Sequence, residues 1–218
     1  MLRHLPNALT CCNLLCGALA IIFIKEIDPI WFVGLAAIFD FLDGFVARML
    51  KVSSPIGKEL DSLADMVTFG LLPAIYWYHL IRTEPLNYLA LFIAVFSALR
   101  LAKFNIDERQ VDGFIGVPTP ANTLFLVTFP YLFPNKIVPV EVAIPIVLLF
   151  SWLLVSPFRM FALKFKNFKW AGNELRFTFL LAAVLLIAIF QVAGVALTII
   201  LYILTSLVTG WRRAGAVS

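Results

Sequence analysis

Four aspartates form two pairs in the sequence, and the spacing within each pair suits joint chemistry. Asp40 and Asp43 are three residues apart, and Asp61 and Asp65 are four apart. Helical residues at these spacings share a face, so each pair can present two carboxylates in one direction. Carboxylate oxygens suit Mg²⁺, Mn²⁺ and Ca²⁺, and two such ions about 4 Å apart assist displacement at phosphorus. All four aspartates are therefore predicted to bind divalent metal, most simply as two ions.

Small residues and one arginine accompany the aspartates. Gly44 and Ala47 leave a shallow groove beside Asp43, and Gly57 opens the facing side four residues before Asp61. Arg48 is placed to meet a phosphate or a carboxylate. Taken singly, such glycines also arise from close helix packing, and an arginine at a helix end also arises from contact with lipid headgroups. The whole set together favours a ligand site.

The composition identifies the elements that must position these residues. Of the 218 residues, 62% are hydrophobic and only 14% are charged, against about 25% charged in soluble domains, and the mean hydropathy is +0.97. Backbone polar groups within a bilayer must be satisfied inside the segment, which favours helices. The chain is predicted to be an all-α integral membrane protein, a polytopic helix bundle that forms a single domain over residues 1–218.

About eight apolar segments are long enough to be considered as membrane spans, since about 20 helical residues cross the hydrocarbon layer. Gln191 and Gly194 either separate the last two segments or interrupt one long hydrophobic run. The expected segments are 8–24, 30–50, 60–80, 86–104, 117–133, 138–158, 177–191 and 194–211.

The placement of basic residues predicts the orientation. With the N-terminus inside, Lys25, Arg82 and Lys136 lie on the outer side, and the other fourteen of the 17 Lys and Arg lie on the inner side. Cytoplasmic loops are enriched in these residues, so both termini are predicted to be cytoplasmic. The connection "KVSSPIGK" at 51–58 then brings the two aspartate pairs together near the inner membrane surface, where their repulsion requires compensation by cations.

The pattern Asp40-x2-Asp43-Gly44-x2-Ala47-Arg48-x8-Gly57-x3-Asp61-x3-Asp65 resembles the signature of the CDP-alcohol phosphotransferase family at every fixed position. The resemblance implies a six-helix membrane core, usually dimeric, with an active site facing the cytoplasm. It also implies transfer of a substituted phosphate from a CDP-linked donor to an alcohol, with release of CMP. Our count of about eight segments exceeds that core.

Further segments resemble the serine-using, membrane-embedded branch of this family. That branch transfers the phosphatidyl group from CDP-diacylglycerol to the hydroxyl of L-serine, giving phosphatidylserine and CMP. The segments are "LPNALTCCNLLCG" at 5–17, "GKELDSLADMVTFGLLPA" at 57–74, "RLAKFN" at 100–105, "GVPTPAN" at 116–122 and "LVSPFR" at 154–159.

The resemblance also implies roles for single residues. Asp65 resembles the general base that removes the proton of the acceptor hydroxyl. Thr119 with Pro120 suits an N-cap and first helical turn, which can bind an anion. The residues expected to hold the nucleotide are Gly44, Ala47, Arg48, Gly57, Asn7 and Thr10. Residue type and position at the inner helix ends, and not the resemblance, give the candidates for binding serine or phosphate: Arg100, Lys103, Asn105, Thr119, Arg159 and Lys164. Basic residues at inner helix ends also arise from topology alone.

Several alternatives remain open from the sequence. Another acceptor, such as glycerol 3-phosphate or inositol phosphate, or an archaeal ether-lipid donor fits the same signature. A cation transporter also uses buried carboxylates, but it leaves the glycines and Arg48 without a role. The expected partners are CDP-diacylglycerol, L-serine, membrane lipids and a second copy of the chain, with no nucleic acid. The expected location is the cell's inner membrane.

Overall fold

The computed structural model describes residues 4–52, 54–106, 114–161, 170 and 172–214. Most of the described chain is helical, and two short strands, β1 (Phe114–Ile115) and β2 (Arg159–Met160), pair antiparallel. The helices are α1 (Leu5–Ile22), α2 (Pro29–Leu50), α3 (Pro55–Asp65), η2 (Met66–Leu71), α4 (Leu72–Leu80), η3 (Leu86–Ala90), α5 (Leu91–Ile106), α6 (Thr119–Thr128), η5 (Phe129–Leu132), η6 (Pro134–Lys136), α7 (Val140–Val155), α8 (Glu174–Phe190) and α9 (Val192–Ala214).

The protein is an all-α membrane protein. Each of the eight expected segments coincides with a helix or with a run of consecutive helices. Within the described ranges, four helical stretches are long and apolar enough to cross a membrane: Leu5–Ile22, Pro29–Leu50, Leu86–Ile106 and Val192–Thr209. The other expected segments are shorter or composite, so the count of about eight spans stays a prediction.

Local sequence explains where the helices around the aspartates begin. Asp28 caps α2, where its side chain accepts a hydrogen bond from the Ile30 N–H at 3.1 Å, and Pro29 follows it. Ser54 caps α3 in the same way, accepting from the Gly57 N–H at 2.9 Å before Pro55. Such caps satisfy otherwise free backbone donors, and proline suits the first helical position.

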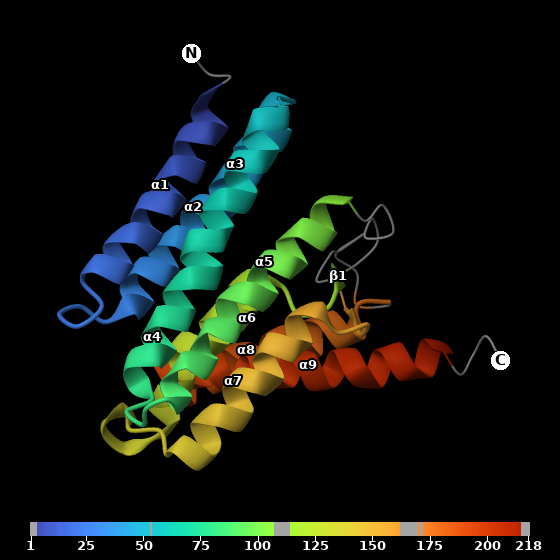
Figure 1. Ribbon diagram of the computed structural model, residues 1–218. Helices are drawn as coiled ribbons and strands as arrows, with labels where there is room; N and C mark the ends of the chain where they lie inside the picture. The colour runs from blue at the N-terminus through green and yellow to red at the C-terminus, as the bar shows by residue number, and fades with distance from the viewer. Residues whose placement is uncertain (1–3, 53, 107–113, 162–169, 171, 215–218) are drawn as a thin grey trace.

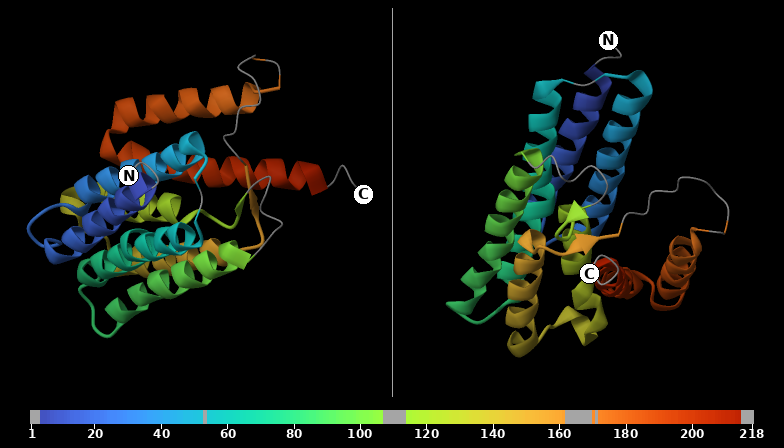
Figure 2. Two further views of the ribbon diagram at one scale, coloured as in Figure 1. Left: turned by 90° about the horizontal axis from the view of Figure 1, so that it is seen from above. Right: turned by 90° about the vertical axis from the view of Figure 1, so that its right-hand side faces the viewer.

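The helices α1, α2 and α3 lie side by side, with the start of α1 at the same end as the end of α2 and the start of α3 (Figure 1). η2 and α4 continue α3, so that one helical run covers 55–80. α5 packs against η2 and α7, and α6 packs against α9. The two views in Figure 2 show that α9 runs across the direction of α1, α2 and α5.

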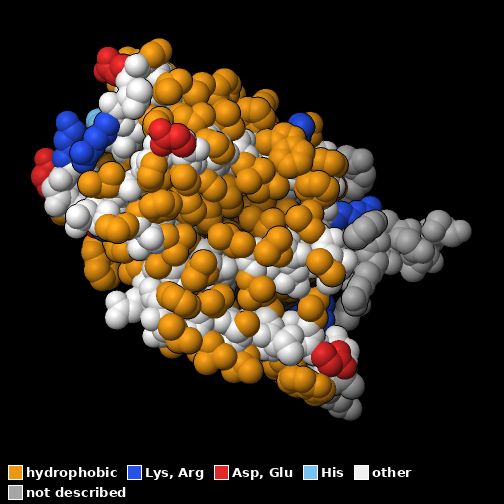
Figure 3. Space-filling view, turned by 90° about the horizontal axis from the view of Figure 1, so that it is seen from below, with side chains coloured by type: hydrophobic (Ala, Val, Ile, Leu, Met, Phe, Trp, Pro, Cys, Tyr) orange, Lys and Arg blue, Asp and Glu red, His pale blue; other side chains and the backbone are white. Residues whose placement is uncertain are grey.

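Large side chains fill the space between η2, α4, α6 and α7. Trp77, Phe69 and Phe125 are fully buried. The Trp77 indole N–H donates to the Leu126 carbonyl at 2.8 Å, and the rings of Phe125 and Phe150 stack with centroids 3.7 Å apart. Hydrophobic side chains cover most of the face shown in Figure 3, as expected of a surface that meets lipid.

The last two expected segments are separate helices. Gln191 takes a φ of 51° and a ψ of −123° between α8 and α9, and this conformation ends the first helix. The chain then turns back tightly, since a Cβ added at Gly194 would lie 2.3 Å from the Leu186 carbonyl oxygen. The sequence left one interrupted run as an alternative, and the structure replaces it with a helical hairpin.

Candidate active site

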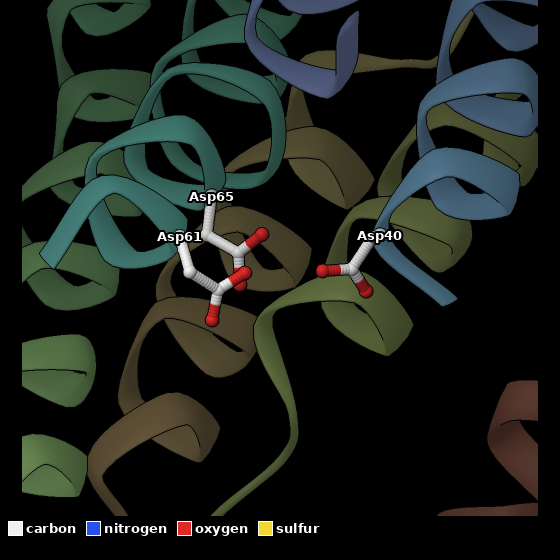
Figure 4. A group of neighbouring side chains, drawn as sticks. All are labelled: Asp40, Asp61 and Asp65. Atoms are coloured by element: carbon white, nitrogen blue, oxygen red, sulfur yellow. The ribbon is translucent and has the colours of Figure 1, made fainter. Parts of the chain in front are cut away.

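Three of the four aspartates meet between two helices. Asp40 lies on α2, whereas Asp61 and Asp65 lie on α3, and one carboxylate oxygen of each lies within 4.8 Å of the others. Figure 4 shows the three carboxylates directed toward one another. Two oxygens that both ligate one ion at 2.0–2.6 Å lie at most about 5 Å apart. The group of three therefore fits a divalent cation, and none of its members is fully exposed.

Asp43 does not belong to this group of three. Its side chain is 7% exposed, and its Oδ2 accepts a hydrogen bond from Thr10 Oγ1 at 2.6 Å. The charges of Asp43 and Asp61 still repel each other, so the fourth carboxylate is close by. Its predicted role as a metal ligand stays a prediction.

Asp40, Asp43, Asp61 and Asp65 together form an acidic centre, to which α1 supplies a second polar contact. Asn13 is fully buried, and its Nδ2 donates to Asp65 Oδ1 at 3.4 Å. The Asn13 carbonyl accepts from Thr68 Oγ1 at 3.1 Å, which joins α1 to the π-helix η2 immediately after Asp65. π-Helical turns are frequent at functional sites. α1 thus fixes both ends of the acidic centre, through Thr10 and Asn13.

The residues expected to hold the nucleotide lie on α1, α2 and α3, the helices that carry the aspartates and their hydrogen-bond partners. A Cβ added at Gly57 would lie 3.0 Å from Asn7 Oδ1, so the two residues face each other across α1 and α3. At Gly44 an added Cβ would meet only the Arg48 guanidinium, at 3.6 Å. Ala47 is partly buried and Arg48 is exposed. The surface of α2 is therefore open at Gly44, and the nucleotide groove stays a prediction.

The candidates for acceptor binding have different surroundings. Arg100 is buried and its Nη1 donates to Thr119 Oγ1 at 3.2 Å. Asn105 instead donates to Ser62 Oγ at 2.9 Å, which ties α5 to α3. Lys103 is exposed.

Two candidates for acceptor binding remain, Arg159 and Lys164. Arg159 is exposed on β2, and Lys164 lies outside the described residues.

The expected N-cap role of Thr119 is wrong. α6 begins at Thr119 itself, Pro118 occupies the N-cap position, and no side chain caps the helix. The Thr119 hydroxyl accepts the hydrogen bond from Arg100 instead of bonding to the backbone of its own helix. A long-range partner on α5 decides the orientation of this side chain.

Asn122 is a polar residue that the sequence analysis did not single out as a site residue. It is fully buried, and neither its amide nitrogen nor its amide oxygen has a hydrogen-bond partner. Buried polar side chains without partners are rare. Its place in "GVPTPAN", three residues after Thr119, was the available indication.

The fold and the site together define a membrane-embedded helical protein with a group of carboxylates between two helices that could hold a divalent cation. The family model described as CDP-alcohol phosphatidyltransferase matches residues 3–157, and the chain belongs to this family.

Three relatives of this chain carry the same name. A CDP-diacylglycerol--serine O-phosphatidyltransferase of Bacillus subtilis is 34% identical over 77% of this chain and 93% of its own length. The protein so named from Methanocaldococcus jannaschii is 38% identical over 66% of this chain and 69% of its own. The protein so named from Helicobacter pylori (strain J99) is 34% identical over 76% of this chain and 74% of its own length.

Proposed function

We propose that the protein is a CDP-diacylglycerol–serine O-phosphatidyltransferase. The observation that carries this proposal is the convergence of Asp40, Asp61 and Asp65 from α2 and α3 within 4.8 Å. Membership of the CDP-alcohol phosphatidyltransferase family supports the reaction class. The names of the relatives from bacteria and an archaeon support L-serine as the acceptor.

The reaction is a displacement at the lipid-side phosphorus of CDP-diacylglycerol. The serine hydroxyl oxygen forms the new bond to phosphorus, and the bond to the CMP oxygen breaks, so that CMP leaves with the electron pair. Asp65 accepts the hydroxyl proton. A carboxylate is a weak base for an alcohol, so proton transfer accompanies the attack and does not precede it.

Asp40, Asp43, Asp61 and Asp65 are the proposed ligands of the divalent metal, Mg²⁺ or Mn²⁺, as two ions. Bound there, the metal neutralises the charge that develops on the diphosphate. Thr10 and Asn13 orient Asp43 and Asp65 through their hydrogen bonds. Outer partners of this kind normally hold ligating carboxylates in position.

The nucleotide is proposed to occupy the open face between α1, α2 and α3. Gly44 and Gly57 leave room for the ligand to approach the helix backbones, and the exposed Arg48 reaches its phosphates. Asn7 lies across from Gly57 and can bond to the same ligand. Ala47 lines the groove one turn after Asp43.

The remaining proposals concern the whole molecule. We propose about eight membrane spans in a single domain, both termini and the active site on the cytoplasmic side of the inner membrane, and a homodimer. The bias of basic residues supports the orientation. Reporter fusions at each loop test the topology, and mass measurement in detergent tests the dimer.

An acceptor screen tests the proposed function. Purified protein receives CDP-diacylglycerol, Mg²⁺ or Mn²⁺, and in turn L-serine, glycerol 3-phosphate, inositol phosphate or no acceptor. Metal-dependent release of CMP together with phosphatidylserine, seen only with L-serine, is expected. Turnover of another alcohol without incorporation of serine contradicts the serine assignment, and failure to release CMP contradicts the reaction class.

A further inference from the structure

A buried cation lies near the acidic centre, and no carboxylate of the described residues is within ion-pair distance of it. Arg100 of α5 is 7% exposed, and the only ion pair among the described side chains joins Lys136 to Asp28. Nη1 of Arg100 donates to a neutral hydroxyl, that of Thr119, and its Nε has no hydrogen-bond partner. A buried guanidinium without a paired anion is costly, so this arrangement points to a negatively charged ligand.

Asn122 supplies a second, independent indication of a ligand. It follows Thr119 by three residues on α6, so the two side chains share a helix face. Both groups of its amide are buried and unpartnered. An amide offers two donors and one acceptor, and burying all of them without partners costs free energy that a bound polar molecule recovers.

Arg100 is also near the residue proposed to accept the hydroxyl proton, since its charge interacts with that of Asp65. In L-serine the carboxylate carbon is three bonds from the hydroxyl oxygen. A carboxylate held by Arg100 therefore leaves the hydroxyl within reach of the acidic centre. Guanidinium groups bind carboxylates through two parallel hydrogen bonds, which fixes orientation as well as position.

We propose that Arg100 and Asn122 together bind the α-carboxylate and ammonium groups of the amino-acid acceptor and so select it over acceptors that lack a carboxylate. This inference rests on the proposed function and deepens it. Thr119 is a positioning residue, which holds the guanidinium toward α6. Lys103 and Arg159, which are exposed, are not part of this site.

The experiment compares acceptors in wild-type protein and in Arg100→Gln. The KM for L-serine is expected to rise about 10- to 100-fold, as for loss of a charge-assisted hydrogen bond. The KM for CDP-diacylglycerol changes less than about threefold. 2-Amino-1,3-propanediol, which keeps the amine and hydroxyl of serine but lacks the carboxylate, is expected to react equally in both proteins. The preference for serine over this amino alcohol therefore collapses in the variant.

Arg82→Gln is the matched control. Arg82 is exposed and lines a pocket with His79 and Lys136, next to the turn between α4 and η3, and none of the four proposed metal-binding aspartates lines that pocket. The KM of the Arg82→Gln protein for serine is expected to match that of the wild type. A rise of equal size in Arg82→Gln shows a general effect of lost charge and overturns the proposal.

Two further variants keep the test decisive if Arg100→Gln does not fold. Asn122→Ala is expected to raise the KM for serine about 3- to 30-fold at an unchanged KM for the donor. Arg100→Lys keeps the charge but loses the planar guanidinium that bonds a carboxylate through two parallel hydrogen bonds. Its KM for serine is therefore expected to lie between those of the wild type and Arg100→Gln. An unchanged KM for serine in Asn122→Ala and Arg100→Lys overturns the inference. Wild-type protein that incorporates no serine contradicts the proposed function itself.

Discussion

Thr10 of α1 donates a hydrogen bond to Asp43 of α2, with 2.6 Å between Oγ1 and Oδ2. The same oxygen lies 3.0 Å from the Pro6 carbonyl, but a hydroxyl has one proton. The shorter contact to a charged acceptor is the stronger. Thr10 was expected to touch nucleotide, and the structure gives it a partner within the acidic centre.

Replacing Thr10 tests this relationship. Thr10→Val keeps the shape but leaves the buried Asp43 carboxylate without its donor, so the apparent affinity for Mg²⁺ or Mn²⁺ is expected to fall about 10- to 100-fold. Titration of activity against metal concentration measures it. Thr10→Ser, which keeps the hydroxyl, is the control and should resemble the wild type. Equal metal affinity in Thr10→Val contradicts the role.

Asp65→Asn tests the general base. The amide cannot accept the hydroxyl proton, so kcat is expected to fall about 10²- to 10⁴-fold. The protein should still fold, because the amide can keep a hydrogen bond with Asn13. Thermal unfolding and CMP release are measured on the same sample. An active Asp65→Asn protein means that another group takes the proton.

Removal of divalent metal tests the acidic centre without relying on activity. Carboxylates at this spacing repel one another, and a bound cation relieves that repulsion. Metal that binds only the folded state raises the free energy of unfolding, by about 2.7 kcal/mol when the metal concentration is 100 times Kd. The wild-type Tm is expected to drop with EDTA and to recover with excess Mg²⁺ or Mn²⁺. In Asp40→Asn with Asp61→Asn the metal-dependent shift should disappear. A metal-dependent change in Tm of the same size in that double variant would show that the metal binds at another site.

Gly17 tests the packing that supports the site. A Cβ there would lie 2.3 Å from Thr68 Oγ1 and 2.8 Å from Thr68 Cα, where α1 meets η2. Gly17→Ala is expected to destabilise the protein by about 1–3 kcal/mol, as overpacking does. Gly34→Ala is the control, because nothing lies within 4 Å of an added Cβ there. Thermal unfolding in one detergent compares them, and equal Tm values contradict the close contact.

The ion pair between Asp28 and Lys136 should make the stability of the protein depend on pH. Burial acts to raise the pKa of Asp28, but hydrogen bonds from Lys136, Tyr131 and the Ile30 N–H outweigh it and hold the pKa below 3.8. Burial acts to lower the pKa of Lys136, yet the bond to Asp28 raises it above 10.5. The carboxylate's contribution is therefore present above 3.8 and lost as pH falls through the lower folded pKa. The ammonium's contribution is present below 10.5 and lost as pH rises through the higher folded pKa.

Asp28→Asn is accordingly expected to lower the Tm at neutral pH. Its difference from the wild type should shrink on acidification below about pH 4, where the wild-type carboxylate becomes protonated. Tm values measured across pH for both proteins check this. A difference that stays constant into acid shows that the carboxylate's charge does not contribute.

The sequence by itself determined the helical segments and the acidic centre. Apolar runs and their breakers are local features, so all eight segments could be located within a few residues of the observed helices. The spacing of Asp61 and Asp65 already places both on one helix face. The connection at 51–58 is short, so α2 and α3 must lie antiparallel. This arrangement brings Asp40 close to Asp61 and Asp65.

Only the tertiary structure decided the partners of the polar side chains. Thr10 meets Asp43 across 33 positions and Arg100 meets Thr119 across 19, and no periodicity within one segment reports on such pairs. Thr119 therefore looked like a helix cap, and Asn122 gave no sign that its amide is buried without a partner. Local propensity and hydrophobic pattern specify each helix separately, whereas the rotation of one helix against another is set by side-chain packing over the whole bundle.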